Sequence, residues 1–261
     1  MTPPPPPPAG SLVDRLRAAG CVFAEEEADI LVSVARDDGE LSEMLARRVA
    51  GEPLEHVVGH AEFDGLRVTV GPGAFVPRRR SEFLAAEAAG LVRAGHVVVD
   101  LCCGVGALGA AVARRAGVPV ELHVADLSPI ALVYARRNVS PYGGRVHRGD
   151  LFGALPTELR GRVDVLVVNA PYVPTGEIGL LPPEAREHEP LAALDGGPDG
   201  LAHHRAIAAA APAWLAPGGA LLIETSGAQA AGTVAACEAA GLRCEVREHE
   251  PLDATVVLAR A

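Results

Sequence analysis

The chain has 261 residues with a formal net charge of −10, and 49% of its residues are hydrophobic. That length and apolar content allow one large domain, or a domain with a small companion, around a sizeable core. The acidic balance argues against general affinity for nucleic acid, because phosphate contacts need surplus positive charge, although it leaves a local basic groove open.

The chain starts with MTPPPPPPAG, a polyproline leader over residues 1–10 that we expect to be extended and mobile. This leader lacks the apolar region of a secretory signal, and no apolar segment approaches the roughly 18–20 residues that span a bilayer. The cysteines are Cys21, Cys102, Cys103, Cys237 and Cys244. Their odd number suits a reducing compartment, and their spacing matches no metal site. We therefore expect a cytoplasmic protein without a metal or a membrane partner.

The N-terminal quarter reads as helices followed by a hairpin. Residues 11–50 carry apolar side chains at three-to-four spacing, and Gly51 and Pro53 end the pattern. Asp64-Gly65 then lies between two short β-prone runs, which is a hairpin signal. We expect a leader over 1–10, a helical domain over 11–58, a β-hairpin linker over 59–77 and the main domain over 78–261.

Strands and helices alternate through the main domain. The expected strands are 96–101, 120–126, 145–150, 163–169, 220–225, 242–250 and 254–260. The expected helices are 107–117, 128–138, 200–219 and 228–241. Ser128 is the expected N-cap of the second helix, with Pro129 in its first turn. Apolar strands separated by helices predict a doubly wound α/β fold, with a parallel sheet covered on both faces.

The turn after the first strand of this sheet holds Gly104, Gly106 and Gly109 in a G-x-G-x-x-G pattern. Alone, this pattern fits a nicotinamide enzyme as well as other nucleotide-binding proteins. Asp100 favours another ligand, because its carboxylate would repel a pyrophosphate placed at that turn. S-adenosylmethionine has no phosphate and carries a sulfonium and an ammonium group, so it suits acidic surroundings.

Two further acids follow the next strands. Asp126 ends the second strand, where it can accept both ribose hydroxyls, and Asp150 follows the third strand, where it can meet the adenine. A single aspartate at a strand end is often only a turn residue. Three on consecutive strand ends predict binding of the methyl donor.

The fourth strand ends in Asn169-Ala170-Pro171-Tyr172 at the same edge. A planar NH₂ group is a poor nucleophile, because its lone pair is delocalised, and it must be held with that lone pair toward the methyl group. The side-chain carbonyl of Asn169 and the backbone carbonyl of Ala170 can accept its two N–H groups. Pro171 restrains Ala170, and Tyr172 can stack on the plane. The tetrapeptide therefore predicts a catalytic clamp that works by positioning, with an ordinary Asn-Pro turn as the alternative.

Taken together, these motifs resemble the HemK/PrmC family, protein N(5)-glutamine methyltransferases that modify peptide-chain release factors. The similar segments are 47–66, 75–84, 97–113, 125–132, 149–152, 169–172, 189–201 and 215–229. The resemblance implies a Rossmann-like class I methyltransferase fold with S-adenosylmethionine as donor. It also implies that residues 11–58 help to recognise a release factor, and that residues 169–172 hold its glutamine side chain.

The strand ends and the resemblance together give a set of donor-binding residues. The set is Asp100, Cys102, Cys103, Gly104, Val105, Gly106, Asp126, Leu127, Asp150, Leu151 and Asn169. The sequence departs from the family pattern at Ala170, which replaces the first proline of N-P-P-Y, and at Cys102, which replaces a glycine. PRRRSE (77–82) replaces an acidic or proline-rich segment, and the helical region is short. These departures leave the substrate protein open.

Other charged groups have simpler interpretations. Arg78–Arg80 is typical of a solvated turn, and the acidic stretch 182–190, with Glu184, Glu187 and Glu189, is expected to be a loop over the site. His203-His204 lacks the spacing of a metal site.

The main alternative function is a DNA or RNA amino-methyltransferase with the same clamp. Three Tyr, five Phe and one Trp leave few groups to stack on bases. A non-catalytic binding module and a nicotinamide oxidoreductase rank lower. We expect a monomer with a protein substrate.

Overall fold

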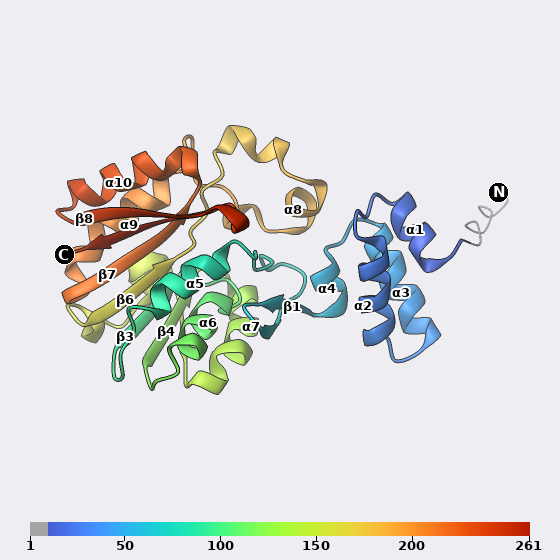
Figure 1. The fold of residues 1–261 in the computed structure, drawn as a ribbon, viewed down its shortest axis with the longest axis horizontal. Coiled ribbons are helices and arrows are strands. Elements are labelled where there is room, and N and C mark those ends of the chain that lie inside the picture. The colour runs from blue at the N-terminus through green and yellow to red at the C-terminus, as the bar shows by residue number, and fades with distance from the viewer. Residues whose placement is uncertain (1–9) are drawn as a thin grey trace.

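The computed structural model describes residues 10–261, so all but the last residue of the expected leader lies outside the described chain. Figure 1 shows helices α1–α4 to one side of a larger body, in which helices pack on both faces of a sheet. No helix within residues 10–261 is long and apolar enough to cross a membrane.

Four helices make up the N-terminal part, and the first three fall within residues 11–50, where the apolar spacing predicts helices. They are α1 (Leu12–Ala18), α2 (Ala24–Val34), α3 (Asp38–Val49) and α4 (Leu54–Val58). Ser11 begins α1 with a capping box, and Asp37 begins α3 by accepting a 2.8 Å hydrogen bond from the backbone N–H of Glu40. Leu16 and Leu31 are fully buried between these helices, so this part has a small core of its own.

The expected hairpin is present, and it joins the two parts. Its strands are β1 (His60–Phe63) and β2 (Leu66–Thr69). Asp64 and Gly65 have φ values of 52° and 69°, the positive values that a two-residue hairpin turn needs. Asn138 in the larger body exchanges hydrogen bonds of 2.8 and 2.9 Å with the backbone of Thr69, and Arg115 binds Asp64 at 2.8 Å. The hairpin is therefore fastened to the larger body at both ends.

The central sheet has seven strands in the order β5-β4-β3-β6-β7-β9-β8. They are β3 (Val97–Leu101), β4 (Glu121–Asp126), β5 (Arg145–Arg148), β6 (Val163–Val168), β7 (Leu215–Thr225), β8 (Arg243–His249) and β9 (Ala254–Arg260). The predicted parallel arrangement is confirmed for β3–β7. It is wrong for β9, which runs antiparallel to β7 and β8, because the short 250–253 connection can join only antiparallel neighbours.

Helices cover both faces of this sheet (Figure 1). Helices α5 (Ser81–Ala89), α6 (Ala107–Ala116) and α7 (Pro129–Val139) cover one face, and α9 (Ala202–Ala210) and α10 (Ala230–Ala239) cover the other. Strand β6 shows the arrangement directly, since Val165 and Val167 pack in one core while Leu166 and Val168 pack in the other.

The helix expected over 200–219 is too long. In the structure α9 ends in a short 3-10 turn over Ala211–Ala213, and residues from Leu215 onward already belong to β7. The alanine-rich run extends the helical pattern in sequence, but Pro217 cannot donate within a helix and Gly218 has a φ of 77°. Helix α5, which the sequence analysis did not assign, precedes β3.

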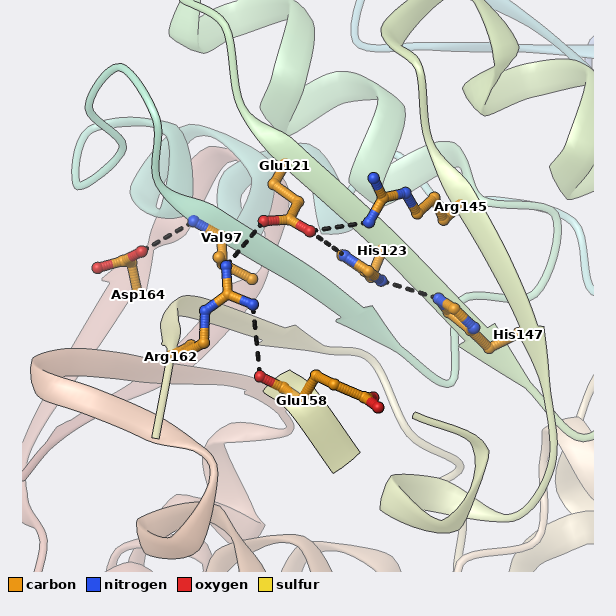
Figure 2. Close-up of polar contacts among 8 residues, drawn as sticks. All are labelled: Val97, Glu121, His123, Arg145, His147, Glu158, Arg162 and Asp164. Atoms are coloured by element: carbon orange, nitrogen blue, oxygen red, sulfur yellow. Dashed lines mark hydrogen bonds and ion pairs between the residues drawn. The ribbon is translucent and has the colours of Figure 1, made fainter. Parts of the chain in front are cut away.

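Charged groups at the amino ends of β4–β6 pair with one another (Figure 2). Glu121 accepts hydrogen bonds from Arg145 at 2.9 Å and from Arg162 at 3.1 Å, and it lies 3.2 Å from His123. The other ring nitrogen of His123 lies 2.8 Å from His147. We call these five residues the amino-end cluster. Its groups satisfy one another, so it needs no ligand.

Candidate functional site

A cavity of about 750 Å³ lies at the opposite, carboxyl edge of the sheet. Its walls come from α4, from the segment before α5, from the ends of β3, β4, β6 and β7, and from residues 181–194. This size is typical of a site for a small organic ligand, and the carboxyl edge is where ligands bind in open α/β sheets.

The turn after β3 brings a helix N-terminus against a buried acid. The backbone N–H of Gly109 donates to Asp100 Oδ2 at 2.8 Å, and a Cβ at position 109 would lie 3.1 Å from that oxygen, so the third glycine permits this approach. Asp100 is only 1% exposed, and its other oxygen has no hydrogen-bond partner within residues 10–261. Burial raises the pKa of Asp100 to about 7.

Asp126 is held by two backbone donors at the end of β4. Gly104 N–H donates to Oδ2 and Ser128 N–H donates to Oδ1, each at 2.8 Å. Burial raises the pKa of Asp126, while these hydrogen bonds act in the opposite direction. Each oxygen keeps a lone pair free, so a diol can still bind. Leu127, next to Asp126, is 60% exposed at the cavity wall and offers an apolar surface.

The backbone conformation at Cys102 explains why the family pattern has a glycine at this position. Its φ of 61° lies in the left-handed region that glycine adopts without strain. Burial, with Asp126, Asp100 and Asp150 nearby, raises the pKa of the Cys102 thiol far above its usual range. The thiol therefore stays protonated, which makes it a weak nucleophile.

The carboxamide of Asn169 has a defined orientation. Its Nδ2 donates to the hydroxyl of Ser81, the first residue of α5, at 3.0 Å. Asn169 and the buried Ala170 both line the cavity. With the amino group of Asn169 taken by Ser81, its side-chain oxygen is the group left to accept a hydrogen bond from a ligand.

Tyr172 is fixed at both ends of its side chain. Its hydroxyl donates to Glu224 at 3.4 Å, and its ring centroid lies 6.4 Å from that of His204. Burial and the nearby Glu224 carboxylate raise the pKa of Tyr172 to about 12. The ring is therefore a neutral wall of the cavity at ordinary pH.

The segment 195–200 supports the backbone of Tyr172 from behind. A Cβ at Gly196 would lie 2.7 Å from the Tyr172 Cα, and a Cβ at Gly200 would collide with the Tyr172 carbonyl oxygen. That oxygen accepts a 2.8 Å hydrogen bond from Gln229 Nε2. The two glycines are thus required by close packing against the tetrapeptide 169–172.

The acidic stretch 182–190 lies over the cavity, and its carboxylates are paired. Glu184 binds Arg48 from α3, Glu187 binds Arg186, and Glu189 binds Arg78 and accepts a 2.9 Å hydrogen bond from a backbone N–H. The pairing favours a cover over free bases, as expected from the sequence, but most of the stretch is helix α8 (Pro183–His188) rather than the expected loop. Among the described residues no cluster of acids, histidines and cysteines could hold a metal.

The structure brings the predicted site residues together with one exception. All of them line the cavity except Gly106, which begins α6 with a φ of 74° and packs against Ala135 and Val139. Sequence reasoning missed Ser81 and Glu224, which also line it. Glu224 carried a signal, because a charged residue closing the apolar run ALLIE parallels Asp100 at the end of VVVD.

The sheet order, the glycine turn and the acids at the strand ends define a Rossmann-like class I methyltransferase. The model of the Methyltransferase small domain matches residues 80–179. A methyltransferase from Pyrococcus furiosus has a similar fold, with a TM-score of 0.57 at 17% identity over 84% of this chain and 98% of that one.

Curated relatives identify the family. The release factor glutamine methyltransferase of Streptomyces coelicolor is 42% identical over 74% of this chain and 69% of its own length. That of Mycolicibacterium smegmatis is 39% identical over 85% and 84%. The 4-amino-L-phenylalanine/4-methylamino-L-phenylalanine methyltransferase of Streptomyces pristinaespiralis is 41% identical over 76% and 69%. The chain belongs to the release factor glutamine methyltransferase family and is an S-adenosylmethionine-dependent methyltransferase.

Proposed function

We propose that this protein transfers a methyl group from S-adenosylmethionine to the side-chain amide nitrogen of a glutamine in a peptide chain release factor. The observation that supports this most is the Asn169 carboxamide, which Ser81 fixes so that its oxygen is left for a ligand. It lies in the same cavity as the buried Asp100 and the half-buried Asp126. The names of the relatives support the choice of glutamine and of the release factor.

The donor half of the cavity fits a cationic, phosphate-free ligand. The unpartnered oxygen of Asp100 is an acceptor that a buried ammonium would satisfy, and Asp126 keeps lone pairs for a ribose diol. Leu127 and Leu151 supply apolar surface for a base, with Asp150 beside them. When bound, the donor supplies an electrophilic methyl group on a cationic sulfur. The remaining predicted contacts, Cys102, Cys103, Gly104 and Val105, line the same end.

The acceptor half holds a flat NH₂. The Asn169 side-chain oxygen and the Ala170 backbone carbonyl accept its two N–H groups, and the Tyr172 ring limits its tilt. In that position the nitrogen lone pair points toward the donor half. The nitrogen becomes acidic once it carries the methyl group, so it needs no strong base to lose a proton. Positioning by these residues then supplies most of the acceleration.

The substrate protein would bind across the N-terminal part and the covering segment 182–190. Arg48 of α3 joins the two through Glu184, and it also binds the buried Glu27 at 2.6 Å. We assign residues 11–58 to substrate recognition, 59–77 to the linking hairpin and 78–261 to catalysis. The five free thiols suit a reducing cytoplasm, and the protein is proposed to act there as a monomer.

A second candidate acceptor is an arylamine-bearing amino acid, whose NH₂ is also planar. Arg80 lines the cavity, and its guanidinium makes no ion pair with any described residue, so it could bind a free carboxylate. One of the relatives is named for 4-amino-L-phenylalanine. Nucleic acid is disfavoured as acceptor, because the cavity wall carries more acids than bases.

The test is transfer of labelled methyl from S-adenosylmethionine to purified release factor, to a release factor with its target glutamine replaced by alanine, to 4-amino-L-phenylalanine and to tRNA. We expect label only on the unaltered release factor, at one glutamine by mass spectrometry. Label on the arylamine alone would refute the release factor as acceptor in favour of the second candidate. Label on tRNA would refute both the release factor and the arylamine as acceptors.

A further inference from the structure

Gln229 is a fully bonded side chain that does not line the cavity. It ends the 3-10 turn Gly227–Gln229, which leads from strand β7 into helix α10. It is half-buried, and it is the only glutamine in the sequence. Both N–H groups and the oxygen of its side-chain amide have hydrogen-bond partners. Ordering a long side chain costs conformational entropy, so an amide held this completely calls for a role.

The amide nitrogen of Gln229 joins two segments that are distant in the sequence. Nε2 donates to the backbone carbonyl of Tyr172 at 2.8 Å and to that of Asp199 at 3.1 Å. The first carbonyl ends the tetrapeptide 169–172, and the second belongs to the segment 195–200 behind it. Backbone hydrogen bonds between Val173 and Gly196 at 2.8 Å already join these two segments into one unit. Gln229 therefore ties this unit to the end of β7.

The orientation of this amide follows from the chemistry of its partners. Carbonyl oxygens only accept hydrogen bonds, so the NH₂ end must face Tyr172 and Asp199. The oxygen end then faces Ser226, whose hydroxyl donates to Oε1 at 2.7 Å. The backbone carbonyl of Gln229 accepts a 3.2 Å hydrogen bond from the hydroxyl of the buried Thr233. Gln229 is thus fixed at both its backbone and its side chain.

Gly200 leaves the space that this contact needs. A Cβ at Gly200 would collide with Gln229 Nε2 as well as with the Tyr172 carbonyl oxygen. The φ of 73° at Gly200 also lies in the region that favours glycine. The residue after Asp199 therefore serves the same hydrogen bond between Gln229 and Tyr172.

Tyr172 needs a backbone anchor, because the hydrogen bond at the far end of its ring is long. Its hydroxyl lies 3.4 Å from Glu224 Oε1, beyond the usual distance between two hydrogen-bonded oxygens. The preceding Pro171 has no backbone N–H to donate. The carbonyl carbon that Gln229 holds is bonded directly to the Tyr172 Cα, so holding it limits how far the Cα and the ring can move.

We propose that Gln229 is a positioning residue for methyl transfer: by holding the Tyr172 carbonyl, it sets the Tyr172 ring against the planar NH₂ of the acceptor without touching the substrate. The inference rests on the proposed function, in which that ring limits the tilt of the acceptor. Loss of both donors would let the ring shift, and the nitrogen lone pair would then point away from the methyl group.

The test compares two variants, using the acceptor that the unaltered enzyme methylates. Gln229→Met keeps the length of the side chain and removes both donors. Its kcat should fall by roughly 10–10²-fold, because a misplacement of about 1 Å or less costs that much. The Kd for S-adenosylmethionine by calorimetry and the KM for the acceptor should each change less than about threefold. Gln229→Glu at pH 8 keeps the size and the acceptor for Ser226 but cannot donate, so its kcat should fall at least as far.

Arg205→Ala is the matched control. Arg205 pairs with the Asp199 carboxylate at 2.8 and 2.9 Å on the surface, so this change leaves both carbonyls that bind Gln229. Its kcat should stay within about twofold of normal. Near-normal kcat in either Gln229 variant would overturn the proposal. A raised acceptor KM with normal kcat, or an equal loss of kcat in Arg205→Ala, would also overturn it.

A measurement without turnover separates this inference from the proposed function. The chain has three tyrosines, so ¹³C labelling of tyrosine carbonyls gives three NMR signals, and the Tyr172 signal is the one lost in Tyr172→Phe. That signal should shift in Gln229→Met and stay in place in Arg205→Ala. An unshifted signal would refute the proposal, even in an active enzyme. If the unaltered enzyme methylates no release factor, the proposed function fails, while the carbonyl shift still decides whether Gln229 holds Tyr172.

The unaltered protein decides if neither Gln229 variant folds. Because Gln229 is the only glutamine, labelled glutamine gives a single pair of side-chain NH₂ signals. Both protons should exchange slowly with solvent, since each is bonded to a carbonyl. Fast exchange of either proton would refute the two-carbonyl contact and the proposal with it.

Discussion

The carboxylates at the two edges of the central sheet differ both in burial and in pairing, since the side chain of Glu121 is 30% exposed whereas Asp100 and Glu224 are buried. In the amino-end cluster, Glu121 has Arg145, Arg162 and His123 as partners (Figure 2). At the carboxyl edge, Asp100 and Glu224 are each 1% exposed, and each has an oxygen without a partner in the structure as described. The charged groups at the amino edge have partners within the protein. Those at the carboxyl edge have oxygens that only a ligand would satisfy.

This difference separates stability from function. An unsatisfied buried polar group costs about 1–3 kcal/mol, so the carboxyl edge lowers the free energy of unfolding. Substitutions there should impair binding or turnover while leaving the fold stable, and some should increase stability. Substitutions in the amino-end cluster should instead lower the free energy of unfolding, while binding and turnover stay unchanged.

The largest expected effect is on turnover at the clamp. Asn169→Ala removes the side-chain acceptor that holds the NH₂ group, and kcat should fall by roughly 10²–10³-fold, comparable to deleting one oxyanion donor. The Kd for S-adenosylmethionine should change much less, because the donor half of the cavity stays intact. Single-turnover methyl transfer measures the first quantity and calorimetry the second. Near-normal turnover would remove Asn169 from the mechanism.

Asp100→Asn should weaken donor binding and stabilise the fold. Loss of a charged hydrogen-bond acceptor should raise the Kd for S-adenosylmethionine by roughly 10–100-fold. The folded pKa of about 7 lies above the ordinary 3.8, so Asp100 lowers stability as pH rises from about 4 to about 7.

Asparagine removes that loss. At pH 8 the variant should therefore gain at most about 4 kcal/mol in free energy of unfolding relative to the unaltered protein, and it should gain far less at pH 4. Urea unfolding at the two pH values measures the gain. An equal gain in unfolding free energy at both pH values, or no gain at either, would show that burial does not raise the pKa of Asp100 in the folded protein.

The smallest effect belongs to the amino-end cluster. Glu121→Gln should cost about 1 kcal/mol of unfolding free energy at pH 7, with no change in donor affinity. The neighbouring His123 and arginines lower the pKa of Glu121 below the usual 4.5, so this cost should disappear as the pH falls below that value. A loss of donor binding in this variant would mean that the two edges are coupled.

Local patterns made most of the fold predictable. The Asp64-Gly65 turn, the Ser128 cap and the apolar strands are set by neighbouring residues, and the strand ends at Asp100, Asp126 and Asn169 follow from them. The end of α9 was misread, because the alanine-rich run resembles a helix until Pro217 stops it.

The supports of the site were harder to predict. Ser81, Asn169, Tyr172 and Glu224 come from three separate segments, and only the order of strands β3, β6 and β7 brings them together. Nothing in the sequence around Ser81 distinguishes it from an ordinary serine at a helix start. The functional residues at each strand end could therefore be predicted from the sequence. The hydrogen bonds that join different segments could not.

The most direct test of the account is calorimetric titration of S-adenosylmethionine between pH 5.5 and 7.5, in two buffers with different ionisation enthalpies. If the unpartnered acid at the carboxyl edge receives the cationic donor, binding favours ionised Asp100. The affinity should then rise as the pH approaches about 7, by at most tenfold per pH unit, with release of up to one proton at the acidic end. Binding without proton release, or with an affinity that does not change over this range, would contradict it.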